Sequence, residues 1–389
     1  MSADFGFTVT KTDGRARRGR VRLAHGEIDT PVFMPVGTRG ALKGLTHDHV
    51  MALDPQIILA NTYHLHLRPG DELISRAGGL HAFMGWDRPI LTDSGGYQVF
   101  SLAGQRTISE EGAAFRSHLD GSLHLLTPES VVDIQARLGS DVAMIFDECA
   151  PWPADRGVVE AAMERTLRWA RRGRDRFLAV QQGAVPEVLR ATPGQAQFGI
   201  IQGGTDLALR DRSVAGTLDV GFEAYAIGGL SVGEPVDVMY DVVAHTAAQL
   251  PEDRPRYLMG TGMPDDLVEC VARGIDMFDC VLPTRNARNG QLLTRHGMIS
   301  IKNARYAEDL APPDPDCSCP TCTRHSRAYL RHLYMVGEIT GAILNTVHNL
   351  HFYLDTMKAI RNAIEFGIFD QFRQEFHRTF SRRQVPVND

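Results

Sequence analysis

Residues 199–227 read GIIQGGTDLALRDRSVAGTLDVGFEAYAI. Residues 199–201 and 225–227 are apolar and strand-like, and residues 208–217 between them have the spacing of an amphipathic helix. Nearly continuous apolar strands joined by a helical crossover indicate parallel strands that are buried on both faces. The stretch therefore predicts one β–α–β unit of an α/β fold.

The same alternation continues on both sides of this unit. Further strands are expected at residues 32–36, 57–60, 90–92, 142–146, 257–259 and 277–278, and further helices at 128–138, 158–174, 236–248 and 265–273. Eight such units predict a closed (β/α)8 TIM barrel. An open doubly wound sheet is the alternative, although no G-x-G-x-x-G motif follows the first strand, which excludes its usual nucleotide-binding version.

Two stretches interrupt the barrel pattern. Residues 114–126 alternate around Asp120-Gly121, which predicts a two-residue β-hairpin inserted between the third and fourth strands. Residues 175–197 are longer than a connection to the next strand requires, and we expect a surface excursion there. Neither stretch should change the centre of the barrel.

The composition is that of a globular protein. The chain has 389 residues and no apolar run near the roughly 18 residues of a membrane span, and its N-terminus lacks the apolar core of a signal peptide. We therefore expect a soluble, cytoplasmic protein. The formal net charge of −6 argues against a non-specific nucleic-acid binder, which is usually basic.

This total conceals an uneven charge distribution. Residues 281–389 hold 14 basic and 10 acidic residues, whereas residues 1–280 hold 27 and 37. Either surface charge simply falls this way, or the cationic last part of the chain meets a polyanion.

Three cysteines stand close together near the C-terminus. Cys317, Cys319 and Cys322 lie in the loop APPDPDCSCPTC (311–322), whereas Cys149, Cys270 and Cys280 are isolated among apolar residues, as buried thiols usually are. Three thiols this close in a cytoplasmic chain indicate a metal rather than disulfides. A zinc deaminase is excluded, because its H-x-E and P-C-x-x-C motifs are missing.

A fourth ligand should come from the helical segment expected at residues 326–366. His325 and His332 follow the cysteines too closely, and His348 is the predicted ligand, although the spacing alone leaves His351 open. Three Cys and one His form a closed set, so we expect one structural Zn²⁺. We expect the barrel to occupy residues 1–310, and a zinc-binding subdomain with C-terminal helices to occupy residues 311–389.

Carboxylates, amides and glycines follow six of the expected strands. They are Asp93-Ser94-Gly95-Gly96-Tyr97-Gln98, Asp147-Glu148-Cys149, Gln202-Gly203-Gly204, Gly228-Gly229-Leu230, Gly260-Thr261-Gly262 and Asp279. A single Asp in such a place is most simply a helix cap or turn residue. Six together predict an active site, because strand ends of a barrel converge on one mouth.

The residue types at this mouth point to glycosyl transfer. Two carboxylates flanking a bond let one attack the anomeric carbon while the other handles the proton of the leaving group. A further carboxylate, with Gln202 and glycine backbone groups, matches the hydrogen-bonding edge of guanine. Arg285 and Arg288, just after Asp279, can grip phosphates or bases of an RNA loop, unless they are ordinary surface arginines. A barrel that binds RNA without chemistry and a glycosidase acting on sugars are the alternatives.

Together, several motifs closely resemble the tRNA-guanine transglycosylases. They are DSGGYQ (93–98), FDE (146–148), GIIQGG (199–204), AIGGLSVGE (226–234), MGTG (259–262), DMFDCVLPTRNAR (276–288) and CSCPTC (317–322) with His348. The resemblance covers about residues 5–370. It implies that Asp279 is the nucleophile on ribose C1′ of the wobble guanosine and that Asp93 is the general acid/base.

The resemblance also implies roles for the neighbouring residues. Those expected around the base are Ser94, Gly95, Gly96, Tyr97, Asp147, Gln202, Gly229 and Leu230, with Tyr97 stacked on it. Those expected at the anticodon loop are Gly260, Thr261, Gly262, Met263, Pro264, Asp265, Asp266, Thr284, Arg285, Asn286, Ala287 and Arg288. Those expected on zinc are Cys317, Cys319, Cys322 and His348.

The reaction implied is a base exchange through a covalent enzyme–tRNA intermediate. Guanine at wobble position 34 of GUN-anticodon tRNAs (Asp, Asn, His, Tyr) is replaced by 7-aminomethyl-7-deazaguanine (preQ1), a step of queuosine biosynthesis. Cys149 and Val232 resemble the bacterial base pocket. Non-catalytic eukaryotic partner subunits are an alternative relative, but both Asp93 and Asp279 are present. A homodimer is expected from the family.

Overall fold

The computed structural model describes residues 5–102, 106–184 and 192–380. Eight parallel strands form its centre, and all eight fall where the sequence predicts strands. They are β4 (Val32–Pro35), β5 (Ile58–Ala60), β6 (Ile90–Thr92), β10 (Val142–Met144), β11 (Ala196–Ile201), β12 (Ala224–Ile227), β13 (Arg256–Leu258) and β14 (Met277–Cys280).

These strands close into a barrel. They pair in the order β4-β14-β13-β12-β11-β10-β6-β5, and a parallel bridge between Val36 and Leu59 joins the two end strands. The Gly37 amide donates to the Leu59 carbonyl at 2.7 Å across the same seam. The (β/α)8 TIM barrel is confirmed, and the open-sheet alternative is wrong.

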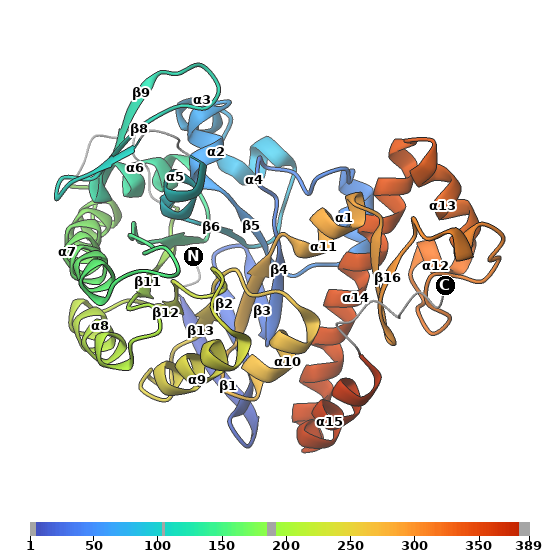
Figure 1. The fold of residues 1–389 in the computed structure, drawn as a ribbon. Helices are drawn as coiled ribbons and strands as arrows, with labels where there is room; N and C mark the ends of the chain where they lie inside the picture. The colour runs from blue at the N-terminus through green and yellow to red at the C-terminus, as the bar shows by residue number, and fades with distance from the viewer. Residues whose placement is uncertain (1–4, 103–105, 185–191, 381–389) are drawn as a thin grey trace.

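Helices surround the barrel as the sequence predicts (Figure 1). They include α6 (Pro128–Leu138), α7 (Arg156–Gln181), α8 (Leu207–Val220), α9 (Val236–Ala247) and α10 (Pro264–Val271). Helix α6 begins at a capping box, in which Thr127 and Ser130 each bond the other's backbone amide, and ends at Gly139 with φ +69°. Local capping therefore fixes both predicted ends of this helix.

Helix α7 is longer than predicted. Phe177 and Val180 lie beyond the expected end at residue 174 and pack against Val132 and Ala136 of α6. This burial continues the helix into the predicted surface excursion, so the excursion is wrong for residues 175–181. Its residues 185–191 lie outside the described residues.

The inserted hairpin is present but differs in detail. Strands β8 (Ala113–Arg116) and β9 (Leu123–Leu126) pair antiparallel, and β7 (Arg106–Ile108) adds a strand that the sequence did not predict. The two-residue turn is wrong: the Ser117 amide donates to the Ser122 carbonyl, so the residues between them form the turn around Asp120-Gly121.

The ends of the chain also form regular elements. An unpredicted antiparallel sheet precedes the barrel: β1 (Gly6–Asp13), β2 (Ala16–Leu23) and β3 (Gly26–Thr30). After the barrel come α11 (Leu282–Arg288), the hairpin β15 (Gln291–Thr294)–β16 (Gly297–Ser300), and the helices α12 (Pro320–Arg324), α13 (Arg327–Met335), α14 (Ile339–Glu365) and α15 (Phe369–Thr379). The helical segment expected at 326–366 is thus two helices, because the chain turns at Gly337 with φ +75°.

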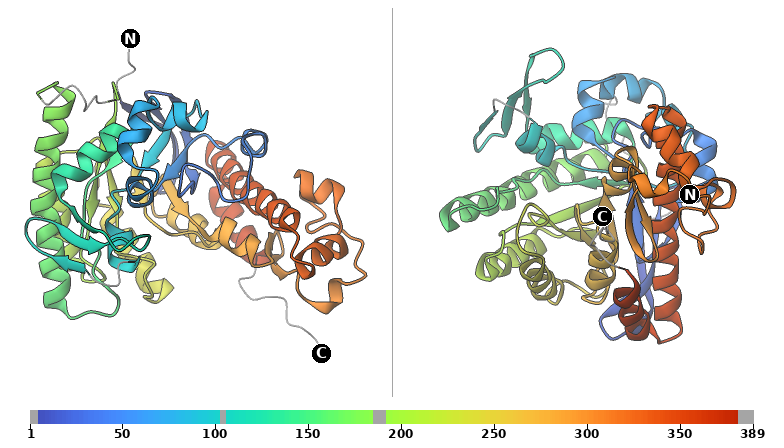
Figure 2. Two further views of the ribbon diagram at one scale, coloured as in Figure 1. Left: turned by 90° about the horizontal axis from the view of Figure 1, so that it is seen from above. Right: turned by 45° about the vertical axis from the view of Figure 1, so that its right-hand side comes forward.

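Helix α14 connects the C-terminal region to the barrel. In Figures 1 and 2 it runs along the barrel, while α12 and α13 lie on its far side. Its residues Phe352, Tyr353, Met357 and Ile360 belong to the same buried core as the barrel strands. The site at the barrel mouth is therefore supported by a helix that reaches into the C-terminal region.

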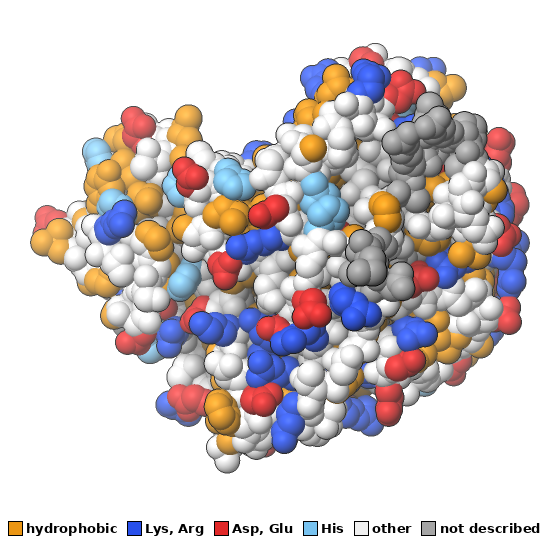
Figure 3. Space-filling model, turned by 180° about the vertical axis from the view of Figure 1, so that it is seen from behind, with side chains coloured by type: hydrophobic (Ala, Val, Ile, Leu, Met, Phe, Trp, Pro, Cys, Tyr) orange, Lys and Arg blue, Asp and Glu red, His pale blue; other side chains and the backbone are white. Residues whose placement is uncertain are grey.

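No helix among the described residues has both the length and the hydropathy that a membrane span requires. Basic and acidic side chains are interspersed on the face opposite to that of Figure 1 (Figure 3), so this face carries no patch of a single sign.

Candidate active site

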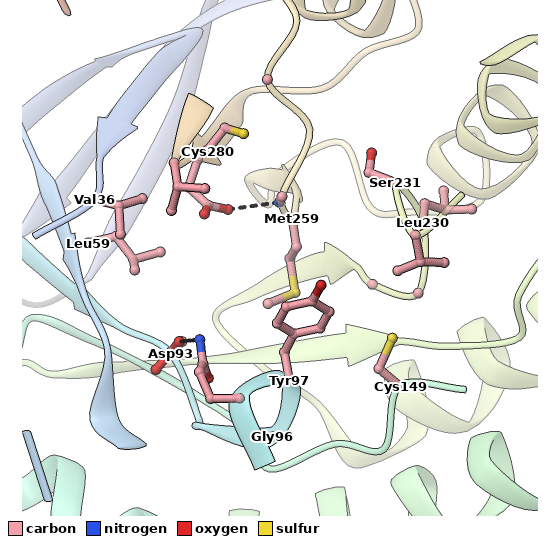
Figure 4. A pocket seen from close by; sticks show the side chains of 18 of the residues that line it. Val36, Leu59, Asp93, Gly96, Tyr97, Cys149, Leu230, Ser231, Met259 and Cys280 are labelled. Atoms are coloured by element: carbon pink, nitrogen blue, oxygen red, sulfur yellow. Dashed lines mark hydrogen bonds between the residues drawn. The ribbon is translucent and has the colours of Figure 1, made fainter. Parts of the chain in front are cut away.

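A cavity of about 580 Å³ opens at the carboxyl ends of the barrel strands. This size is typical of small-molecule sites. Asp93, Asp147, Gln202 and Asp279 all line it, as the strand-end argument predicts. Figure 4 shows Asp93 on one side, Cys149 and Leu230 on another, and the Tyr97 and Met259 side chains between them.

Asp93, the first residue after β6, is almost fully buried. Its carboxylate accepts hydrogen bonds from Asn61 Nδ2 (2.5 Å), the Thr62 amide (2.8 Å) and Gln98 Nε2 (2.9 Å). Burial raises the pKa of Asp93 to about 6, although these three donors oppose the shift. A carboxyl group with this pKa can both give and take a proton near neutral pH.

Asp147 and Gln202 form a paired polar floor. Gln202 Nε2 donates to Asp147 Oδ2 at 2.7 Å, and Ser94 Oγ donates to Asp147 Oδ1 at 3.3 Å. Burial raises the pKa of Asp147 to about 6, with Asp93 contributing repulsion. The Gln202 amide has a second hydrogen. The pair therefore offers a flat ligand an acceptor beside a donor.

Asp279 lies at the end of β14. Tyr257 Oη and the Gly260 amide both donate to Asp279 Oδ1, at 2.5 and 2.9 Å. Burial raises the pKa of Asp279, and these two donors oppose the shift. Both bonds fall on Oδ1, and no hydrogen bond to Oδ2 is found among the described residues. One carboxylate oxygen is thus held while the other is left for a reacting atom.

Glycines bring backbone close to this polar floor. A Cβ on Gly229, which has φ +68°, would collide with Gln202 Oε1, and a Cβ on Gly96 would lie 2.7 Å from the Asp147 carbonyl oxygen. Only glycine fits at these two positions. Both line the cavity, where their backbone is open to a ligand.

The loop after β12 forms another wall. Leu230 and Val232 both line the cavity, and Leu230 lies on the same side of it as Cys149 (Figure 4). Glu234 accepts from the Ser231 and Val232 amides at 2.5 and 3.0 Å, and Ser231 Oγ lies 2.7 Å from Thr261 Oγ1. Ser231 has φ +58°. These bonds hold the loop in a conformation that a serine rarely adopts.

The residues expected at the anticodon loop divide into two groups. Gly260, Gly262, Met263, Asp266 and Arg285 line the cavity, and Asn286 and Arg288 are partly exposed. Thr261, Pro264, Asp265, Thr284 and Ala287 are buried and do not line the cavity. The buried group can support the rim, but its side chains are not available to a ligand.

The predicted metal ligands come together. Cys317, Cys319, Cys322 and His348 can bind a metal ion, since one ligand atom of each lies within 4.8 Å of the others. His348 Nδ1 lies 3.8, 3.5 and 3.2 Å from the three sulfurs in chain order. Zinc bonds of ordinary length at a tetrahedral angle would place nitrogen and sulfur roughly 3.6 Å apart. The donor set therefore fits zinc.

A second contact orients the histidine. His348 Nε2 lies 2.6 Å from the Leu293 carbonyl oxygen, which fixes Nε2 as the protonated nitrogen and turns Nδ1 toward the thiols. His351 does not join the cluster. Of the two histidines that the spacing leaves open, His348 is thus the one that lies beside the three cysteines.

Several cavity residues were not predicted. Asn61 follows β5, so the strand-end argument would have found it. Tyr257 lies inside β13, and Met259 follows it as an apolar residue. Tyr257 looks like an ordinary core residue in the sequence, and only its contact with Asp279 reveals its place in the site.

Comparisons with known proteins agree with this geometry. The family model described as queuine tRNA-ribosyltransferase matches residues 12–382. Relatives named queuine tRNA-ribosyltransferase include one from Sphingopyxis alaskensis, 54% identical over 98% of this chain and 100% of its own. A relative from Nitrosomonas eutropha is 55% identical over 95% of this chain and 99% of its own. One from Shewanella frigidimarina is 53% identical over 98% of each chain.

Proposed function

This chain belongs to the queuine tRNA-ribosyltransferase family, and we propose from this that it replaces guanine at wobble position 34 of GUN-anticodon tRNAs by preQ1. The family's activity is that of a glycosyltransferase, a tRNA-guanine transglycosylase of queuosine synthesis. The single observation that supports the exchange is the pair Asp93 and Asp279, which share one cavity and are each held by fixed donors.

Asp279 is the proposed nucleophile. Its free Oδ2 attacks ribose C1′ while Tyr257 and the Gly260 amide hold Oδ1. The C1′–O bond forms as the C1′–N9 bond breaks, and the electron pair of the broken bond leaves with the purine. Protonated Asp93 gives the departing base its proton, which matches a pKa of about 6.

The second displacement reverses these steps with another base. Ionised Asp93 takes the N9 proton of preQ1, N9 attacks C1′, and the Asp279 carboxylate leaves. Two displacements at one carbon retain the anomeric configuration. The fixed hydrogen bonds keep both carboxylates in place between the two steps.

Base recognition is proposed at the polar floor. Ionised Asp147 accepts from the ring N–H and amino group of guanine or preQ1, and Gln202 and the Gly229 amide donate to the carbonyl. Tyr97, whose side chain is 57% exposed in the cavity wall, stacks on the base, with Leu230, Ser94, Gly95 and Gly96 around it. Cys149 and Val232 border the aminomethyl side.

The proposed partner is the anticodon loop of tRNA. Of the residues expected at that loop, Gly260, Met263, Arg285, Asn286 and Arg288 are accessible. Arginine suits RNA phosphates and base edges because of its planar array of donors. A homodimer and a cytoplasmic location are proposed from the family resemblance alone.

The proposed metal is one structural Zn²⁺ per chain, held by Cys317, Cys319, Cys322 and His348. A Cys3His set leaves no open coordination position, so the ion supplies folding free energy rather than chemistry. The reaction steps above use none of its ligands.

An exchange assay with guanine and preQ1 side by side on one GUN tRNA tests this function. We expect radiolabelled guanine to enter the tRNA and preQ1 to displace it. The Asp279→Asn variant should do neither. Binding of tRNA without exchange by the wild type would instead support the RNA-binding alternative, and turnover of a sugar substrate would support a glycosidase.

A further inference from the structure

Arg210 of α8 is a fully buried cation directly behind the base-binding wall. Its relative exposure is 0%, and it does not line the cavity. Among the carboxylates in the described ranges, none lies within ion-pair distance of its guanidinium, whose hydrogen bonds all go to backbone carbonyls. A buried charge without a carboxylate partner is costly, so a function is expected for it.

The three carbonyls belong to the ends of two neighbouring strands. Arg210 Nη1 donates to Ile201 O (2.8 Å), Nη2 to Gly228 O (2.8 Å) and Nε to Gly204 O (2.9 Å). Ile201 is the last residue of β11, and Gly228 is the first after β12. The guanidinium thus fixes the two segments that carry Gln202 and Gly229.

The contact between Arg210 and the Gly228 carbonyl also determines where the Gly229 N–H points. In a trans peptide the C=O and the next N–H point in opposite directions. Because the Gly228 carbonyl points at Arg210, the Gly229 N–H points away from it. Arg210 Nη2 also lies only 3.7 Å from the position of a Cβ on Gly229. Gly229 lines the cavity, so its N–H, which points away from the cation, is placed to meet a ligand there.

Arg210 remains charged at neutral pH. Burial lowers its pKa to about 10, and Cys149 and Glu234 offset part of this shift. The same charge is felt at the cavity wall, where it opposes the rise in the pKa of Cys149. Few other groups can offset negative charge in a cavity that contains Asp93, Asp147 and Asp279.

We propose that Arg210 is a positioning residue that stabilises the negative charge of the departing purine. This inference rests on the proposed function. When the C1′–N9 bond breaks, its electron pair moves into the purine and charge spreads to the carbonyl oxygen. That oxygen lies on the Gly229 N–H, which the bond from Arg210 to the Gly228 carbonyl orients and polarises. The charge is complete before Asp93 delivers its proton.

The test compares Arg210→Met with Arg210→Lys in the full chain. Arg212→Met is the matched control, because Arg212 lies on the same helix but is exposed and pairs with Glu160 and Glu164. The measured quantity is the single-turnover rate of covalent adduct formation with a GUN tRNA transcript on a denaturing gel. Removal of one electrostatic donor from an active site typically slows chemistry by about 10²-fold or more.

We expect Arg210→Met to slow adduct formation by about 100-fold, with a much smaller change in the tRNA concentration giving half-maximal rate. Arg210→Lys should recover part of the rate. The N9–H of 8-azaguanine is more acidic than that of guanine, so 8-azaguanine is the better leaving base. With 8-azaguanine at the wobble position, the loss of rate in Arg210→Met should therefore be smaller. A role in folding alone predicts equal losses for both bases.

Three outcomes would overturn the inference. They are a wild-type rate in Arg210→Met, a loss independent of the leaving base, and an equal loss in Arg212→Met. If Arg210→Met does not fold, the rates of Arg210→Lys with guanine and with 8-azaguanine as the leaving base test the inference in its place. A wild-type enzyme that forms no adduct refutes the proposed function instead, so the two failures are distinguishable.

Discussion

Asp147 illustrates how one buried side chain sets both stability and pH dependence. Its pKa rises from 3.8 to about 6, because burial penalises the ionised form. A carboxyl group with a raised folded-state pKa binds its proton more tightly in the folded protein. The free energy of unfolding therefore falls as pH rises from about 4 through about 6, and the loss is complete above that range.

Asp147→Asn should raise thermal stability at pH 8 while abolishing base binding. The raised pKa of Asp147 corresponds to a gain of about 3 kcal/mol at most in the free energy of unfolding, because each pKa unit is worth about 1.4 kcal/mol. Asn fits the contacts, because its oxygen can accept from Gln202 and its amide can donate to Ser94. The gain in melting temperature should vanish near pH 4. A gain that is equal at pH 4 and pH 8 would contradict the assignment.

Affinity for the free base should depend on the same group. Below about pH 6 Asp147 becomes protonated and ceases to accept from the base, so preQ1 binding should weaken by up to tenfold per pH unit. Calorimetric titration of the wild type with preQ1 between pH 5 and 8 measures this. Binding that strengthens on acidification would contradict it.

Helix α14 carries His348, a proposed metal ligand, and also contacts the segments around Asp279. Asn349 Nδ2 donates to the Pro283 and Gln291 carbonyls, both at 3.0 Å, and its Oδ1 accepts from the Leu293 amide at 3.0 Å. Tyr353 Oη donates to the Gly262 carbonyl. The helix therefore holds α11, which begins three residues after Asp279, and the 259–263 loop, whose Gly260 amide donates to Asp279.

Asn349→Ala should weaken the interaction with tRNA more than the interaction with the free base. The change leaves buried backbone groups unpaired, which costs about 1–3 kcal/mol for each unsatisfied group, and it loosens α11. The KM for tRNA should rise several-fold while the KM for preQ1 stays near its wild-type value. Asn362→Ala, an exposed position on the same helix, is the control. Equal effects from both variants would show that α14 does not act through Asn349.

The same elements show what the sequence can and cannot predict. The eight barrel strands and the strand-end residues were predictable because burial on both faces leaves a strong apolar signal. The sheet β1–β3 was missed, since its strands are rich in charged residues such as Arg18, Arg20 and Arg22. Tyr257 and Arg210 were missed because their roles depend on contacts between separate strands and helices.

Across the whole molecule, the barrel and the C-terminal region share one core. Phe352, Tyr353 and Met357 of α14 pack with the barrel strands. We therefore expect the two parts divided at residue 310, the barrel and the C-terminal region, to unfold together. The net charge of −6 includes the three aspartates that line the cavity, Asp93, Asp147 and Asp279, and the proposed recognition of one RNA loop does not require a basic total.

Zinc removal should therefore destabilise the entire chain. Structural zinc contributes folding free energy directly, and a shared core transmits its loss to the barrel. Calorimetry should show a single unfolding transition with bound zinc and, after chelation, a single transition at lower temperature. Two separate transitions would indicate that residues 311–380 unfold alone. Elemental analysis that finds no zinc in the purified protein would refute the metal assignment.

The most direct test of the proposed mechanism is to trap the covalent intermediate. Wild-type protein is mixed with a GUN tRNA transcript without a replacing base, and the products are separated on a denaturing gel. We predict a protein–RNA adduct that maps to the peptide containing Asp279, disappears on addition of preQ1 and is absent in Asp279→Asn. An adduct that persists in Asp279→Asn would contradict the account.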